Sequence, residues 1–98
     1  MINSKDISIA ADHPAYAGHF PNFPVLPGAV LLDEVLRAIA GERGGDLEIW
    51  QIASAKFLGA VRTGDALRVQ FDAQTPGAIS FSVLAAGRKV VSGVLNER

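Results

Sequence analysis

The sequence predicts an α+β fold in which an antiparallel sheet packs against a single helix. One run of apolar residues with helical character follows a proline-rich segment. Downstream of that run come four segments in which apolar and polar residues alternate, as they do in strands with one buried face. Turn residues separate these segments, so consecutive strands are expected to pair antiparallel. The pattern indicates the architecture and does not by itself name a fold.

A short strand is expected first, from Ile7 to Ala11, because Ile7 and Ile9 alternate with Ser8. The segment 12–27 is expected to be a loop, since proline fixes φ and lacks the N–H that helices and inner strands need. Its prolines are Pro14, Pro21, Pro24 and Pro27. The last three are spaced by three residues, which favours an extended, polyproline-like approach to the element that follows.

A helix is expected to begin at Pro27, because the fixed φ and missing N–H of proline cost nothing at a first helical position. The glycines expected to end it are Gly41, Gly44 and Gly45. Apolar residues occupy most of its circumference, namely Val30, Leu31, Leu32, Val35, Leu36 and Ile39. Such a helix is expected to be buried on nearly all sides. Its polar residues Asp33, Glu34 and Arg37 therefore need individual explanations.

Four strands are expected after the helix, and each is rich in β-branched or aromatic side chains. They span Leu47–Leu58, Ala66–Thr75, Ile79–Ala85 and Arg88–Leu95. The turns between them are marked by Gly64-Asp65, Pro76-Gly77 and Gly87-Arg88. Trp50, in the first of these strands, is expected in the core or at an interface.

The composition indicates one small domain, residues 1–98, that associates with a second subunit. Hydrophobic residues make up 49% of the chain and charged residues 19%, and a domain this short buries too little surface to hide so many apolar side chains alone. Because there is no cysteine, disulfides and thiolate metal sites are excluded. A net charge of −1 gives no support for binding to nucleic acid.

The N-terminal residues lack the apolar run of a signal peptide. No stretch of the sequence approaches the roughly 20 apolar residues that a membrane-spanning helix requires. A cytoplasmic protein without a membrane span is therefore expected.

The segment 18–33 combines three groups that acid–base catalysis uses. It carries an imidazole at His19 on a proline-rich loop, a backbone N–H at Gly28 near the expected helix start, and a carboxyl group at Asp33 in the second helical turn. Imidazole titrates near neutral pH and can remove a weakly acidic proton. N–H groups at a helix N-terminus stabilise developing negative charge. These are the parts of an acid–base site with an oxyanion hole.

The stretch that begins at His19 resembles the active-site motif of the β-hydroxyacyl-ACP dehydratases of fatty-acid synthesis. The shared pattern is His-Phe-Pro-x-x-Pro-Val-x-Pro-Gly, with an acid fourteen residues after the histidine. The likeness continues through Ala55-Lys56-Phe57, through the segment 61–67 with its Gly-Asp turn, and through the segment 87–91. The resemblance spans nearly the whole chain and implies the hot-dog fold, a long central helix wrapped by an antiparallel sheet.

The resemblance also implies roles for three residues. His19 would remove the α-proton beside the thioester, Asp33 would help the β-hydroxyl group leave as water, and the Gly28 N–H would bind the thioester oxygen. In the family, the histidine and the acid of one site come from opposite subunits, so a homodimer or an oligomer of dimers is expected. The implied substrate is a 3-hydroxyacyl chain on acyl carrier protein, in fatty-acid, polyketide or polyene biosynthesis. No cofactor and no metal ion are implied.

Other residues near the motif have a weaker connection with catalysis. The candidates for the substrate pocket are Phe20, Phe23, Pro27 and Arg37. Loop packing is the ordinary role of the two phenylalanines, and helix initiation is that of the proline. Glu34 is the alternative acid, but it lies about 100° around the helix from Asp33. His13 has no counterpart in the motif.

Two positions depart from the family's pattern. Phe23 stands where the family usually has a small or polar residue, which would narrow or reshape the mouth of the pocket. Arg37 stands one turn beyond Asp33, where the family commonly has Gln. An Asp–Arg pair at this spacing stabilises the charged carboxylate, whereas donation of a proton to the leaving hydroxyl group requires the neutral form.

Two other functions stay open on the sequence: an acyl thioesterase of the same fold, and a non-catalytic acyl-binding subunit. Thioesterases generally lack the His-Phe-Pro signature and place their acid elsewhere. A binding subunit would have no chemical need to keep both His19 and Asp33. The ultraviolet absorbance of an enoyl thioester, compared with the release of free thiol, separates the three functions.

Overall fold

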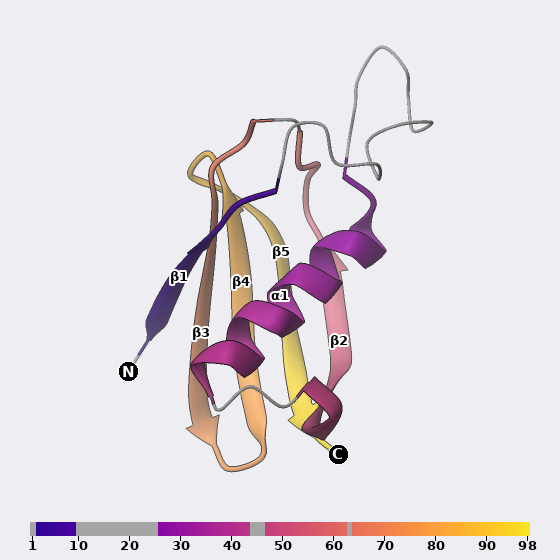
Figure 1. Ribbon diagram of the computed structural model, residues 1–98, viewed down its shortest axis with the longest axis vertical. Coiled ribbons are helices and arrows are strands. Elements are labelled where there is room, and N and C mark those ends of the chain that lie inside the picture. The colour runs from indigo at the N-terminus through magenta and orange to yellow at the C-terminus, as the bar shows by residue number, and fades with distance from the viewer. Residues whose placement is uncertain (1, 10–25, 44–46, 63) are drawn as a thin grey trace.

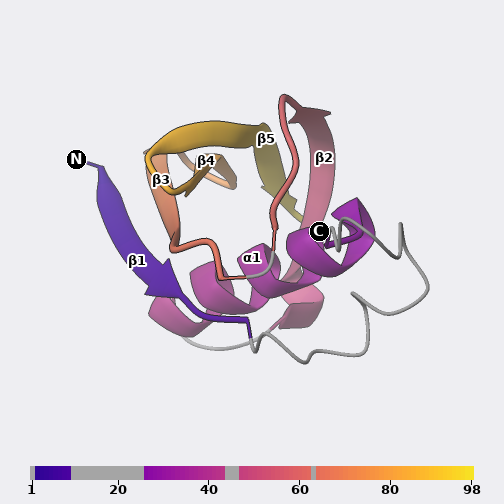
Figure 2. The ribbon, with the colours of Figure 1, turned by 90° about the horizontal axis from the view of Figure 1, so that it is seen from above.

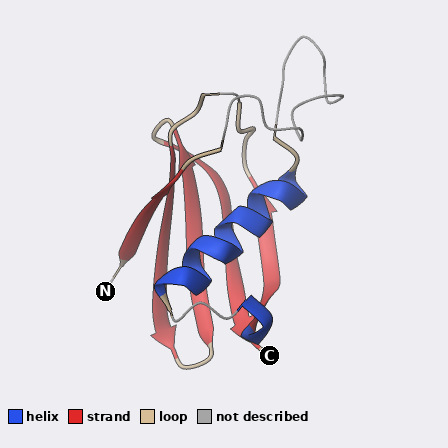
Figure 3. Ribbon diagram, viewed as in Figure 1, coloured by secondary structure: helices blue, strands red, loops and turns tan. Residues whose placement is uncertain are grey.

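The computed structural model describes residues 2–9, 26–43, 47–62 and 64–98, and shows one α-helix lying across a five-stranded sheet (Figures 1 and 3). The elements are β1 Asn3–Ile7, α1 Gly28–Glu42, the short 3-10 helix η2 Leu47–Ile49, β2 Trp50–Phe57, β3 Leu67–Thr75, β4 Ala78–Ala85 and β5 Arg88–Glu97. The expected α+β architecture is therefore confirmed. None of the helices in the described part of the chain is long and apolar enough to cross a membrane.

The strand order in the sheet is β1-β3-β4-β5-β2, and every neighbouring pair is antiparallel. The two strands that flank α1 in the sequence, β1 and β2, therefore lie at opposite edges of the sheet. The helix has to pass from one edge to the other, so it lies diagonally over one face (Figure 1). Seen from above, the sheet curves around the helix (Figure 2), as a strongly twisted antiparallel sheet does when one face packs on a cylinder.

Two tight hairpins join β3 to β4 and β4 to β5. Gly77 has φ of 77° in the first turn, and Ala86 and Gly87 have φ of 49° and 82° in the second. Two successive residues with positive φ suit the right-handed twist of the strands they connect. The second turn lies one residue earlier than expected, since Arg88 already belongs to β5.

The core lies between α1 and the concave face of the sheet. Alternate residues of β4 point into it, as the alternation in the sequence predicted. The largest fully buried side chains are Ile39, Ile79, Leu95, Val35, Val61, Val69, Val83, Val90 and Val91. Burial of one such aliphatic side chain contributes roughly 1.5–3 kcal/mol to folding. The bounds of β3, β4 and β5 are within two residues of the expected ones.

The N-terminal elements differ more from the expectation. The first strand is Asn3–Ile7 and ends where the expected strand Ile7 to Ala11 begins, while Ala10 and Ala11 lie outside the described residues. Pairing of its backbone with β3 favours extended structure even where the side chains are polar. Pro27 caps α1 from outside, and Gly41 lies within its last turn instead of ending it. The bonds from the Arg43 N–H to the carbonyls of Ile39 and Ala40 hold that turn despite the lower helix propensity of glycine.

The helix is buried on one side only, contrary to the expectation of near-complete burial. In the described chain, the residues exposed on its outer face recur every four positions: Ala29, Asp33, Arg37 and Gly41. A single subunit thus leaves this outer stripe of α1 uncovered.

Trp50, which was expected in the core or at an interface, is a core residue and is 5% exposed. The Arg43 guanidinium lies 5.9 Å from the centroid of its ring.

Candidate functional site

The start of α1 and its outer stripe carry the predicted site residues that the structure describes. These are Pro27, Gly28, Asp33 and Arg37. The predicted base His19 lies outside the described residues, and so do Phe20, Phe23 and His13.

The N-terminal turn of α1 presents backbone N–H groups at Gly28. Pro27 is the N-cap, and its carbonyl accepts bonds from the N–H groups of Val30 and Leu31, both at 3.1 Å. The N–H of Gly28 precedes any carbonyl in helical register, so no bond within the helix uses it. The helix dipole adds a partial positive charge at this end. A developing oxyanion at this point would be stabilised by both effects.

Phe57, at the end of β2, packs against this turn. A Cβ atom built on Gly28 would lie 2.7 Å from two carbons of the Phe57 ring, a distance that real Cβ atoms do not reach without a shift. An alanine at this position would therefore force the Phe57 ring, which is 51% exposed, to move aside. Sequence reasoning missed this contact, because Phe57 carried only the signal of an aromatic residue in a strand.

A hydrogen bond fixes the segment that leads into the helix. The N–H of Leu26 donates to the carbonyl of Val61 at 2.9 Å, and both residues are buried, with exposures of 4% and 2%. A buried backbone bond of this kind contributes about 0.5–1.5 kcal/mol net, and its loss would leave two buried polar groups unsatisfied. Gly28 thus lies two residues after Leu26, whose backbone is held in place by this buried hydrogen bond.

Asp33 and Arg37 form the ion pair that their spacing predicted. The Nε of Arg37 donates to Oδ2 of Asp33 at 2.9 Å, and both side chains are more than half exposed. The hydrogen bond from Arg37 to Asp33 raises the pKa of the guanidinium, and the charge of the same carboxylate adds to the effect. Since the arginine keeps its charge, the outer stripe presents a carboxylate oriented by a neighbouring cation.

Gly28 and Asp33 do not face one another on α1. Asp33 lies five positions after Gly28, which corresponds to about 140° around the helix and about 7.5 Å along its axis. The Asp33 side chain is 54% exposed, so its own chain does not enclose it. Glu34, the alternative acid, is half-buried. An acid–base site that used both Gly28 and Asp33 within one chain would have them on different faces of the helix.

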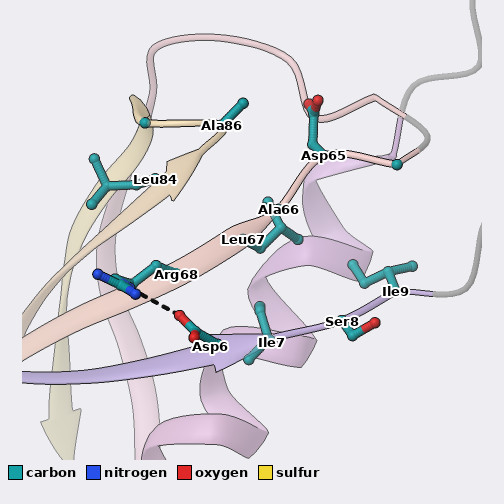
Figure 4. Close-up of a pocket in the computed structure, with 12 residues that line it drawn as sticks. Asp6, Ile7, Ser8, Ile9, Asp65, Ala66, Leu67, Arg68, Leu84 and Ala86 are labelled. Carbon is teal, nitrogen blue, oxygen red and sulfur yellow. Dashed lines mark hydrogen bonds and ion pairs between the residues drawn. The ribbon is translucent and has the colours of Figure 1, made fainter.

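A surface cavity of about 560 Å³ lies elsewhere, at the edge formed by β1 and the start of β3 (Figure 4). Apolar side chains of Ile7, Ile9 and Leu67 line it, and the ion pair between Arg68 and Asp6, at 2.9 Å, stands at its rim. None of the predicted site residues that the structure describes lines this cavity. The described residues also contain no cluster of three or more acidic, histidine or cysteine side chains that could hold a metal ion.

Comparison with protein families gives a match over residues 3–94 to the ApeI-like family, described as ApeI dehydratase. Among individual relatives, the 3-hydroxyacyl-acyl-carrier-protein dehydratase FabZ of Chlamydia pneumoniae is 32% identical over 66% of this chain and 48% of its own length. The FabZ of Chlamydia trachomatis serovar L2 is 30% identical over 94% of this chain and 67% of its own length. The chain thus spans about half the length of several relatives that it matches.

Solved structures resemble this chain in fold. The dehydratase heterocomplex ApeI:P from Xenorhabdus doucetiae covers 99% of this chain and 88% of its own, with a TM-score of 0.74 at 19% identity. The (R)-hydratase from A. caviae involved in PHA biosynthesis covers 100% and 95%, with a TM-score of 0.64 at 15% identity. Together with the helix wrapped by five antiparallel strands, these likenesses confirm the expected hot-dog fold.

Proposed function

The chain belongs to the ApeI-like dehydratase family, and from this premise we propose that it converts a 3-hydroxyacyl thioester, carried on acyl carrier protein, to the trans-2-enoyl thioester. The observation that carries the proposal is the conjunction of the His19 motif with an N–H at the start of α1 that no bond within the helix uses, and an exposed carboxylate on the same helix. The FabZ relatives are named 3-hydroxyacyl-acyl-carrier-protein dehydratases, and that name supports both the carrier and the acyl group proposed for this chain.

The proposed reaction needs one base, one acid and one oxyanion donor. His19 takes the α-proton, and the electron pair of that C–H bond moves toward the thioester carbonyl, whose oxygen gains negative charge beside the Gly28 N–H. The pair then forms the double bond while the bond from the β-carbon to oxygen breaks. Asp33 protonates the departing hydroxyl group, so water leaves. Return of the proton from His19 to Asp33, directly or through solvent, restores both groups.

Each site is proposed to be shared between two subunits of a homodimer. The exposure of Asp33, and its position on a different face of α1 from Gly28, support a partner that brings the second half of each site. The partner would also cover the stripe of α1 that one chain leaves open. The ApeI:P neighbour is named a heterocomplex, so the measured assembly also tells a homodimer from pairing with a different chain.

The outer edge of β2 is the proposed contact between subunits. In the sheet, β2 is bonded to β5 on one side, and within the described residues no strand pairs with its other side. Large apolar side chains are exposed along and just beyond it, with Ile52 at 38%, Phe57 at 51% and Leu58 at 48%. An unpaired edge with exposed apolar side chains is a site for strand pairing with another chain. Pairing there would place the partner next to Phe57 and the start of α1.

The test is an assay of the purified chain on enoyl and 3-hydroxyacyl thioesters of several lengths, on acyl carrier protein and on coenzyme A. A change in enoyl-thioester absorbance without release of thiol is the expected result. Release of thiol would indicate a thioesterase. The absence of both reactions, with acyl binding retained, would indicate a non-catalytic subunit.

A further inference from the structure

The connection between β2 and β3, residues 58–66, holds the start of α1. Its Val61 carbonyl accepts the bond from the Leu26 N–H at 2.9 Å, two residues before Gly28. Phe57, immediately before the connection, places its ring against Gly28 itself. Two independent contacts to the beginning of the helix thus come from one stretch of chain.

The first half of the connection is tied to β5. The N–H groups of Leu58 and Gly59 both donate to the carbonyl of Val90, at 2.8 and 3.3 Å. Because Val90 is buried in the central part of the fold, this half has a fixed support. The position of the Val61 carbonyl also depends on the contacts that restrain the residues after Val61.

Asp65 restrains the second half. Its Oδ2 accepts the Arg62 N–H at 2.8 Å, and its own N–H donates to the Arg62 carbonyl at 3.1 Å. The turn between the two residues includes Gly64, whose φ of 85° is one that glycine adopts without strain. The side chain of Asp65 therefore reaches back three residues to the Arg62 N–H and closes the turn, as the acid of a capping box does.

A second group joins the turn to the hairpin of β4 and β5. The Nη2 of Arg88 lies 3.6 Å from the same Oδ2 of Asp65, whose side chain is only 17% exposed. Figure 4 shows Asp65 in the turn just before Ala66 and Leu67, where β3 begins. One carboxylate oxygen of Asp65 thus accepts the Arg62 N–H and forms an ion pair with the guanidinium of Arg88 in β5.

We propose that Asp65 is a positioning residue for the oxyanion donor. By closing the turn at Arg62 it fixes the Val61 carbonyl, and through the bond to Leu26 it sets the place of the Gly28 N–H. The inference rests on the proposed function, in which that N–H binds the thioester oxygen. An oxyanion donor acts only within hydrogen-bond distance of the developing charge, so a displacement of a fraction of an ångström lowers kcat.

The experiment compares Asp65→Ala with Asp65→Asn. The alanine variant removes the acceptor for the Arg62 N–H, whereas the asparagine variant keeps an acceptor oxygen and loses the charge toward Arg88. We expect Asp65→Ala to lower kcat roughly tenfold with KM changed less than twofold, since loss of a whole donor costs about 10²–10³. Asp65→Asn should keep most of kcat. The matched control is Asp6→Asn, which breaks the surface pair with Arg68 at another edge and should leave kcat unchanged.

Hydrogen exchange of the Leu26 amide gives a readout that does not depend on turnover. It should become faster in Asp65→Ala and stay near the wild-type rate in Asp65→Asn, with both proteins folded by circular dichroism. Should Asp65→Ala fail to fold, Asp65→Leu takes its place, since a leucine side chain is close in size to aspartate and has no acceptor for the Arg62 N–H.

Wild-type kcat in the folded alanine or leucine variant would overturn the inference, and so would a rise in KM alone. Equal loss in Asp65→Asn and Asp65→Ala would assign the effect to the charge beside Arg88 instead of the turn. If the wild-type chain itself turned over no thioester, the proposed function would fail. The exchange rate of the Leu26 amide would still decide whether Asp65 holds the start of α1.

Discussion

The ring of Phe57 lies directly against Gly28, since a Cβ there would be 2.7 Å from two ring carbons unless the ring moved. The two residues are 29 positions apart in the sequence, and their contact joins the end of β2 to the first turn of α1. The same glycine thus serves the packing of the fold and presents the N–H proposed for catalysis.

Gly28→Ala should destabilise the protein through this contact. Overpacking of a core costs about 1–3 kcal/mol, and the cost here should lie at or below the lower end because the half-exposed Phe57 ring can move; a denaturant titration measures it. In a Phe57→Ala background the clash is gone, and alanine is the better helix former by about 1 kcal/mol, so there Gly28→Ala should be neutral or stabilising. The same loss in both backgrounds would show that Phe57 is not the obstacle.

His19→Ala should abolish hydration of an enoyl thioester, because no other group is proposed to take up the α-proton. Circular dichroism and the elution volume of the variant should match those of the wild type. His13→Ala is the matched control, and it should keep near wild-type activity. Substantial turnover by a folded His19→Ala protein would remove His19 from the mechanism.

Asp33→Asn should lose most of the activity, since an amide cannot donate a proton and recover it. Its effect on the free energy of unfolding should be small, because the side chain is 54% exposed and surface ion pairs contribute about 0–1 kcal/mol. Glu34→Gln is the matched control on the neighbouring position and should keep much of the activity. The reverse order would identify Glu34 as the acid.

Mixing His19→Ala with Asp33→Asn tests the shared site. Neither variant alone should turn over substrate. After co-refolding with random pairing, about half of the dimers are mixed, and each mixed dimer has one site without a lesion, so roughly a quarter of the wild-type activity should return. Mass spectrometry of the intact assemblies confirms that mixed dimers formed. Verified mixed dimers without activity would mean that each chain builds its site alone.

The sequence predicted correctly those features that depend on residues close together along the chain. Alternation with a period of two placed β3, β4 and β5 within two residues, and glycines marked the turns where φ is positive. The spacing of four between Asp33 and Arg37 predicted their ion pair, because one helical turn brings such residues together. The motif around His19 indicated the dehydratase family, which the match over residues 3–94 confirms.

Only the tertiary structure decided the features that depend on contacts between distant segments. The alternation in the sequence begins only at Ile7, yet backbone pairing with β3 makes a strand from Asn3. The closeness of Phe57 to Gly28, and the bond from Leu26 to Val61, arise from the path of the chain between β2 and β3. A helix apolar on most of its circumference was expected to be covered, but one curved sheet reaches one side of it, which leaves Asp33 exposed. The periodicity of the sequence shows which face of a helix or strand is apolar. The topology of the chain determines which segment covers that face.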